Sequence, residues 1–185
     1  MRRAGENYFG GSVVISVIAT VLVLVAIVSA QRSRPVRLQN SGAPPWPAPR
    51  SVATGVRAAG LSLSAAPGVV TRYAVHLDVL MDGKPVRVPA GIGIDCAARQ
   101  IAPLYTDDDS GVIQIASDSP EPRFTLGEFF DEWQVPLADA TAVVDGTPSD
   151  GDPGAIVLGP HQEIAVTFGS PPARIPGTYA FPPGV

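Results

Sequence analysis

The sequence is poor in the residues that bind soft metals or form crosslinks. It has one cysteine, Cys96, and two histidines in 185 residues. A single cysteine excludes an internal disulfide framework and a thiolate zinc cluster, because both need several thiols in one chain. Charged residues make up only 16% of the chain, and the formal net charge is −4. This charge argues against a nucleic-acid-binding protein, for which a basic surface is expected.

The motifs of several large enzyme classes are also missing. The sequence has no phosphate-binding P-loop, no dinucleotide-binding glycine pattern after a strand, and no G-x-S-x-G nucleophile motif. Cys96 lies near Asp95 and Arg99 but has no identifiable histidine partner, so we expect a buried, inert thiol rather than a nucleophile. The sequence therefore nominates no catalytic residue and no cofactor.

One long hydrophobic run is present, from Ser12 to Ala30, and it contains no charge, proline or glycine. As a helix, residues 13–30 would span about 27 Å, close to the roughly 30 Å of a bilayer core. The run predicts a single-pass transmembrane helix over 12–30, after a short N-terminal tail at 1–11, with the lipid bilayer as its partner. A cleaved signal peptide is the alternative, since Arg2 and Arg3 give a basic start and small residues precede Gln31.

The charges around the run bear on orientation. Three arginines follow it within residues 31–37 and two precede it. Taken alone, this distribution favours a cytoplasmic domain. Long domains are translocated largely regardless of charge, so we predict an extracytoplasmic domain at the cell membrane. Cleavage of a signal peptide would instead give a secreted protein.

Residues 31–72 carry six arginines, no acidic residue and the proline-rich stretch APPWPAP. Such a segment favours semi-rigid, polyproline-like backbone. We interpret it as a linker that holds the domain away from the membrane. The alternative is a peptide ligand for an aromatic groove, with Trp46 as its anchor. The chain then becomes acidic, with 16 acidic and five basic residues in 73–185.

Strand signals begin near Arg72. Apolar residues alternate from Val75 to Met81 and lead into Asp82-Gly83, a pair typical of a tight hairpin turn. The acidic segment 107–109 interrupts a second expected hairpin, and it lacks the ligand spacing of an EF-hand calcium loop, so we interpret it as a solvated turn. Further expected strands are 101–105, 112–116, 142–144, 156–158 and 164–168, with another hairpin turn at Asp145-Gly146.

The segment FTLGEFFDEW predicts one short helix. Thr125 and Glu128 have the spacing of a capping box. Leu126, Phe129, Phe130 and Trp133 fall on one helical face, which we expect in the core. The acidic residues Glu128, Asp131 and Glu132 are expected on a solvated face.

Together these signals predict an α+β domain over residues 73–170. Its mostly antiparallel sheet is packed by one short amphipathic helix, because the helix alone cannot cover this much apolar sequence. The proline-rich residues 171–185 are expected to form an extended tail, held to the domain by Tyr179 and Phe181.

Four segments occur in the order VPAGIGID, IAPLYTDDDSGVIQIAS, FTLGEFFDEWQVPL and GPHQEIAVTFG. Over residues 73–170 this pattern resembles an uncharacterised bacterial family of secreted or membrane-anchored domains with a PLHTHD-x-SG-x-IH-x-ES core and a TLG-x-FF-x-x-W helix. The resemblance implies no activity. The histidines of that core would fit a metal site, but here the matching positions are Tyr105, Asp107 and Gln114.

Only His76 and His161 remain to supply imidazole ligands. With Asp107 they would reach three protein ligands, the usual minimum for a catalytic zinc ion, if they converged. Nothing in the sequence brings them together, so we predict no metal site and no tightly bound transition metal. The leading hypothesis is a membrane-anchored extracytoplasmic domain with a non-catalytic binding or structural role and an unknown protein partner. The alternatives are a metal-binding domain with a degenerate histidine site or an unspecified enzyme.

Overall fold

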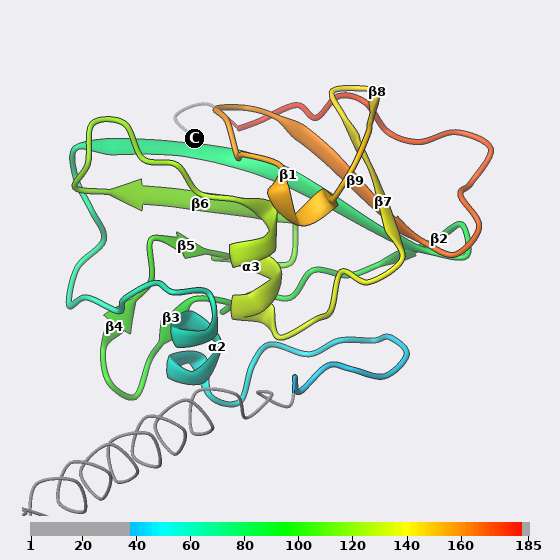
Figure 1. Ribbon diagram of the computed structural model, residues 1–185. Helices are drawn as coiled ribbons and strands as arrows, with labels where there is room; N and C mark the ends of the chain where they lie inside the picture. The colour runs from blue at the N-terminus through cyan, green and yellow to red at the C-terminus, as the bar shows by residue number, and fades with distance from the viewer. Residues whose placement is uncertain (1–37, 183–185) are drawn as a thin grey trace, which may run out of the picture. The chain divides into compact units, whose positions relative to one another are not determined.

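The computed structural model describes residues 38–182 (Figure 1). The predicted transmembrane helix at 12–30 and the first residues of the predicted linker lie outside this range. Within it, no helix has the length and apolar character needed to cross a membrane.

The described residues form an α+β domain with a mostly antiparallel sheet, as predicted. The order of strands in the main sheet is β5-β6-β1-β9-β7-β8, with β2 paired to β1, and β3 and β4 form a separate small sheet. Among the strand pairs in the described residues, β1 and β9 run parallel, and every other pair is antiparallel. The strands are β1 (Thr71–Met81), β2 (Lys84–Val86), β3 (Ile94–Asp95), β4 (Gln100–Ile101), β5 (Leu104–Tyr105), β6 (Val112–Ser117), β7 (Ala140–Val144), β8 (Thr147–Ser149) and β9 (Glu163–Phe168).

Local turn chemistry explains two of the antiparallel strand pairs, β1–β2 and β7–β8. Asp82 and Gly83 have φ values of 49° and 74°, and Asp145 and Gly146 have 49° and 78°. Two successive residues in the left-handed region are the requirement of a tight hairpin turn, so both predicted Asp-Gly hairpins are confirmed. The predicted strand at 156–158 is wrong. Only Val157 forms an isolated bridge there, after a short 3₁₀ helix at Pro153–Ala155.

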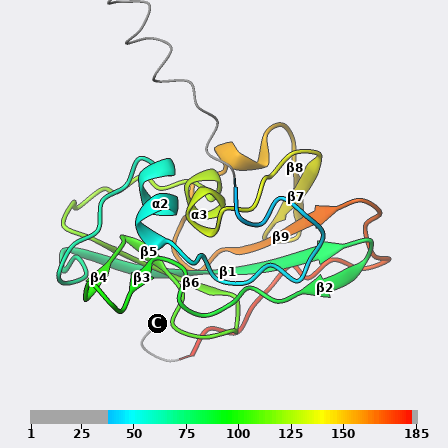
Figure 2. The ribbon, with the colours of Figure 1, turned by 90° about the horizontal axis from the view of Figure 1, so that it is seen from below.

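Within residues 38–182, two α-helices cover a single face of the sheet: α2 (Val52–Ala58), which was not predicted, and α3 (Leu126–Trp133), which was (Figure 2). Helix α3 starts with the predicted capping box, in which the Thr125 amide donates to the Glu128 carboxylate at 2.6 Å. The predicted apolar face of α3 is confirmed, because Leu126, Phe129, Phe130 and Trp133 are each at most 1% exposed.

Part of the predicted linker belongs to this core. Trp46 is 6% exposed, and its ring makes edge-on contacts with the rings of Trp133 at 5.8 Å and Phe168 at 5.3 Å. Helix α2, which also lies in the predicted linker, packs against α3. Trp46 and α2 are therefore part neither of a free spacer nor of an exposed peptide ligand, because apolar burial holds them on the domain. A second expectation also fails, since Cys96 is exposed rather than buried.

Candidate functional site

The residues nominated from the sequence do not form one cluster. His76 lies in β1, Asp107 in the exposed turn after β5, and His161 in the turn before β9. Among the described residues, the potential metal-ligand atoms that converge belong to His76, Asp78 and Glu163. They lie within 4.8 Å of one another. Of the three residues predicted from the sequence, only His76 therefore belongs to the cluster. Its other two members, Asp78 and Glu163, were not predicted.

The parallel pair β1 and β9 positions all three side chains. In the register of this pair His76 lies opposite Glu163. Asp78 is two residues further along β1, and residues two apart in a strand share a face of the sheet. The intervening Leu77 is buried in the core with Val75 and Val79. The cluster therefore lies on the outer face of the sheet, away from the helices.

His76 is held at both ring nitrogens. Its Nε2 lies 2.9 Å from the carbonyl oxygen of Ser110, and its Nδ1 lies 2.7 Å from Oε2 of Glu163. A carbonyl can only accept, so Nε2 carries hydrogen and donates it. The remaining nitrogen, Nδ1, faces the carboxylate, and the proton between them resides on one partner or the other. The imidazole is thus oriented with Nδ1 toward the cluster.

The turn that carries Ser110 depends on a glycine. Gly111 has φ of 84°, and a Cβ there would lie 2.6 Å from the Leu77 carbonyl oxygen and 3.2 Å from Nε2 of His76. Any other side chain would push the turn away from β1. The turn is also fixed by the Ser110 amide, which donates to Asp108 at 2.9 Å, and hydrogen bonds from Ser110 lower the pKa of Asp108.

The environment of the cluster favours retention of a proton. Burial lowers the pKa of His76, but the hydrogen bond to Glu163 and the charges of Glu163 and Asp78 outweigh burial and raise it above its ordinary value. Burial raises the pKa of Glu163, and Asp78 adds to this effect while His76 opposes it. The second carboxylate oxygen of Glu163, Oε1, is buried without a hydrogen-bond donor, and the Asp78 carboxyl can pair with Glu163 only by sharing a proton, which raises the pKa of Glu163. A buried polar atom left unpaired is costly, so this oxygen has capacity for a further ligand.

Two clefts approach the cluster. The first, of about 320 Å³, is lined by Asp78 and Ser110 together with residues of the β2 region, including Arg87. Arg87 forms an exposed ion pair with Asp109, with 2.8 Å between the guanidinium nitrogen and the carboxylate oxygen. Asp78 therefore connects the buried pair His76–Glu163 to an open surface.

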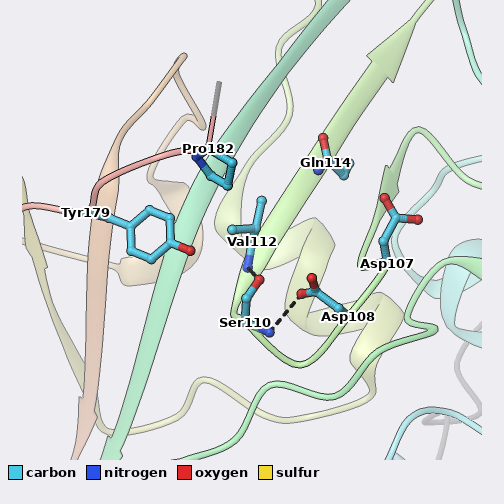
Figure 3. Close-up of a pocket in the computed structure, with 7 residues that line it drawn as sticks. All are labelled: Asp107, Asp108, Ser110, Val112, Gln114, Tyr179 and Pro182. Carbon is cyan, nitrogen blue, oxygen red and sulfur yellow. Dashed lines mark hydrogen bonds between the residues drawn. The ribbon is translucent and has the colours of Figure 1, made fainter. Parts of the chain in front are cut away.

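The second cleft, of about 130 Å³, is shown in Figure 3. Tyr179 and Pro182 lie on one side and Asp107 on the other, with Ser110 and Val112 between them. Gln114 also lines this cleft, and it pairs with Tyr105 on one neighbouring strand and with Ala74 on the other. None of the side chains of Tyr105, Asp107 and Gln114, which the resemblance matches to histidines, joins the convergent cluster.

Glu132 is another buried acidic residue, and its burial contradicts the sequence-based expectation. It was expected on a solvated face of α3 but is 1% exposed, and both of its carboxylate oxygens are buried without a hydrogen-bond partner. Burial and the nearby charge of Glu128 raise its pKa well above its ordinary value.

Comparison with known proteins adds no function to this geometry: no family model, curated protein or solved structure matches the chain. The resemblance to the bacterial family stays a hypothesis.

Proposed function

We propose that this chain is a membrane-anchored, extracytoplasmic and non-catalytic domain that binds a divalent metal ion through His76, Asp78 and Glu163. The observation that carries the proposal is the convergence of three potential ligand atoms within 4.8 Å. The membrane anchor rests on the hydrophobic run 12–30, and the extracytoplasmic side rests on the rule that long domains translocate largely regardless of flanking charge.

The donor set fits a borderline cation such as zinc. Zinc accepts imidazole nitrogen and carboxylate oxygen at about 2.0–2.2 Å, which for a tetrahedral site puts ligand atoms roughly 3.4 Å apart. To reach this spacing, the distance of 2.7 Å between His76 Nδ1 and Glu163 Oε2 would have to increase. Any pair of ligand atoms in the cluster near the upper limit of 4.8 Å would have to move closer together. Rotation of the carboxylate side chains supplies both movements. Three protein ligands leave a fourth position for water or another small ligand.

The contacts around the cluster support a ligand role for His76. A metal-binding histidine commonly donates its second ring N–H to a backbone carbonyl, which fixes the ring and leaves the other nitrogen to the metal. The hydrogen bond from Nε2 of His76 to Ser110 provides this arrangement. The unpartnered Oε1 of Glu163 gives the carboxylate a further atom for bidentate binding or for a metal-bound water.

Charge also favours a cation. Within residues 38–182, neither Asp78 nor Glu163 forms an ion pair with lysine or arginine. A divalent ion would neutralise both carboxylates and replace the proton held between His76 and Glu163. The expectation of no metal site counted imidazoles and thiolates, whereas this set needs only one histidine.

Metal content tests the proposal. The full-length chain in detergent, equilibrated with Zn²⁺ and then dialysed, should retain about one equivalent by elemental analysis. His76→Asn, Asp78→Asn and Glu163→Gln should each abolish retention. His161→Asn and Asp107→Asn are matched controls, because both residues lie outside the cluster, and they should retain the ion. The site would be refuted if all five variants retained the same amount of Zn²⁺, or if neither the parent nor any variant retained it. The cluster would then be a structural pair that shares a proton.

A further inference from the structure

The described part of the predicted tail, residues 171–182, covers the outer face of the sheet on the side opposite the helices (Figure 2). We call residues 175–182 the strap. Its residues alternate between half-buried and exposed, the pattern of extended backbone lying flat on a surface. The half-buried positions are Ile175, Gly177, Tyr179 and Phe181, and the exposed ones are Pro176, Thr178, Ala180 and Pro182.

Tyr179 contacts the cluster directly. Its ring stacks on the imidazole of His76 with 3.7 Å between centroids and an angle of 5° between the planes. Phe181, two residues on, packs against His161 at 5.0 Å and against Tyr179 at 4.9 Å. The strap therefore contacts both histidines of the chain through successive inward-facing aromatic rings, as the sequence-based expectation for Tyr179 and Phe181 required.

A close backbone approach fixes where the strap begins to cross the sheet. A Cβ at Gly177 would lie 2.8 Å from the Cα of Gly146, so a larger residue would separate the strap from the β7–β8 turn. The same turn supports the cluster, because Asp145 Oδ1 accepts a hydrogen bond of 2.9 Å from the Glu163 amide. The turn at Asp145-Gly146 thus serves as a common support for the strap and for Glu163.

The strap is held differently from the strands beneath it. None of the described tail residues 171–182 pairs with a strand. The contacts found for the strap are ring packing and the glycine approach. Segments with few backbone hydrogen bonds open locally at a small fraction of the global unfolding free energy. Yet His76 is 6% exposed and Glu163 is 1% exposed, although both lie on the outer face.

We infer that the strap is a lid over the proposed metal site, with Tyr179 as the residue that blocks access to His76 and positions its ring. This inference rests on the proposed function. The metal ion enters and leaves when the strap lifts, and restacking of Tyr179 returns Nδ1 to its orientation toward Glu163. Tyr179 is a positioning residue and supplies no ligand.

Metal exchange rates test the lid in the full-length chain. Tyr179→Ala, and a chain ending at Arg174, should both bind and release Zn²⁺ about tenfold faster than the parent, because loss of one stacked aromatic pair changes the opening equilibrium by about this factor. Stopped-flow measurements with a chromogenic chelator report both rates. Tyr179→Phe keeps the ring and should match the parent. Unchanged rates for Tyr179→Ala would overturn the inference and indicate entry through the cleft beside Asp78.

A second measurement needs no metal. Diethyl pyrocarbonate acylates accessible imidazole, and mass spectrometry of peptides reports the reaction at His76. Tyr179→Ala should react at His76 about tenfold faster than the parent and than Tyr179→Phe. Acceleration in a chain that retains no Zn²⁺ would support the strap and refute the metal site. Retained Zn²⁺ with no change in acylation or in exchange rates would support the site and refute the lid.

Discussion

Glu132→Gln should make the stability of the domain less dependent on pH. Glu132 is buried in α3, and neither of its carboxylate oxygens has a partner. Burial first, and the charge of Glu128 second, raise its pKa well above the ordinary value. Folding therefore favours the protonated form, and the substitution replaces this group with a neutral one of nearly the same shape.

The sign of the effect follows from proton linkage. Below the unfolded-state pKa, about 4.3 for a glutamate, both states are protonated and the group contributes no pH dependence. Above it the unfolded carboxyl ionises while the folded one stays protonated. The free energy of unfolding of the parent then falls by about 1.4 kcal/mol per pH unit until the pH passes the folded-state pKa. Glutamine has no such slope, so the advantage of the variant should grow with pH through this window and then level off.

Urea unfolding of the full-length chain in detergent, followed by tryptophan fluorescence at pH values from 4 upward, measures this difference. Both tryptophans of the chain, Trp46 and Trp133, lie in the core, so their emission reports on its integrity. The buried amide introduced by Glu132→Gln lowers the free energy of unfolding by an amount that does not change with pH. The informative quantity is therefore the slope of the free energy of unfolding against pH. Glu121→Gln at an exposed position is the control and should show a constant offset from the parent. Parallel curves for Glu132→Gln and the parent would refute the reasoning and show that Glu132 is ionised in the folded state.

Two further outcomes are expected. Trp133→Ala should lower the free energy of unfolding by about 3–5 kcal/mol in urea titrations, because a fully buried aromatic side chain is removed. An unchanged midpoint would mean that the aromatic face of α3 is not part of a packed core. The full-length chain should sediment with membranes, and its domain should be digested by protease added from outside. Release into the medium would contradict the anchor, and protection of the domain would contradict the orientation.

The parts of the fold that sequence predicted correctly depend on short-range chemistry. The Asp-Gly hairpins and the capping box of α3 are each determined by residues within a few positions of one another. The apolar face of α3 is also a local signal, because the helical spacing of its apolar residues can be recognised without the rest of the chain. The α+β class, which the structure confirms, follows because one helical face and several strands must share a core.

The errors arise where tertiary contacts decide. The proline-rich stretch around Trp46 has the composition of a linker, but the edge-on contacts of its indole with Trp133 and Phe168 hold it in the core. Glu132 carries a charge on a helix, which usually indicates a solvated face, but Gly93 approaches its carboxylate and Gly55 of α2 approaches its backbone, so the residue is buried instead. None of these contacts leaves a local signal in the sequence.

Only the part of the cluster that lies on β1 could have been predicted from the sequence. His76 and Asp78 alternate on one strand, a signal for two polar side chains on a shared face. Their third partner, Glu163, is 87 residues from His76, and it is placed by the parallel pairing of β1 with β9. The sequence pattern nominated Asp107 and His161 instead, because one stands at a position matched to a histidine by the resemblance and the other is the second imidazole of the chain.

For the proposed metal site, the position of the cluster in the sheet predicts separate control of affinity and exchange rate. Strands β1 and β9 are the middle pair in the strand order, and each is hydrogen-bonded on both sides, so the backbone beneath His76, Asp78 and Glu163 is fixed before any ion arrives. Fixed ligand positions reduce the ordering that binding must impose, and this favours affinity. The strap lies outside that hydrogen-bonded framework and contributes no ligand. Substitutions in β1 and β9 should therefore change the dissociation constant for Zn²⁺, whereas substitutions in the strap should change both rate constants in the same direction with a smaller change in their ratio.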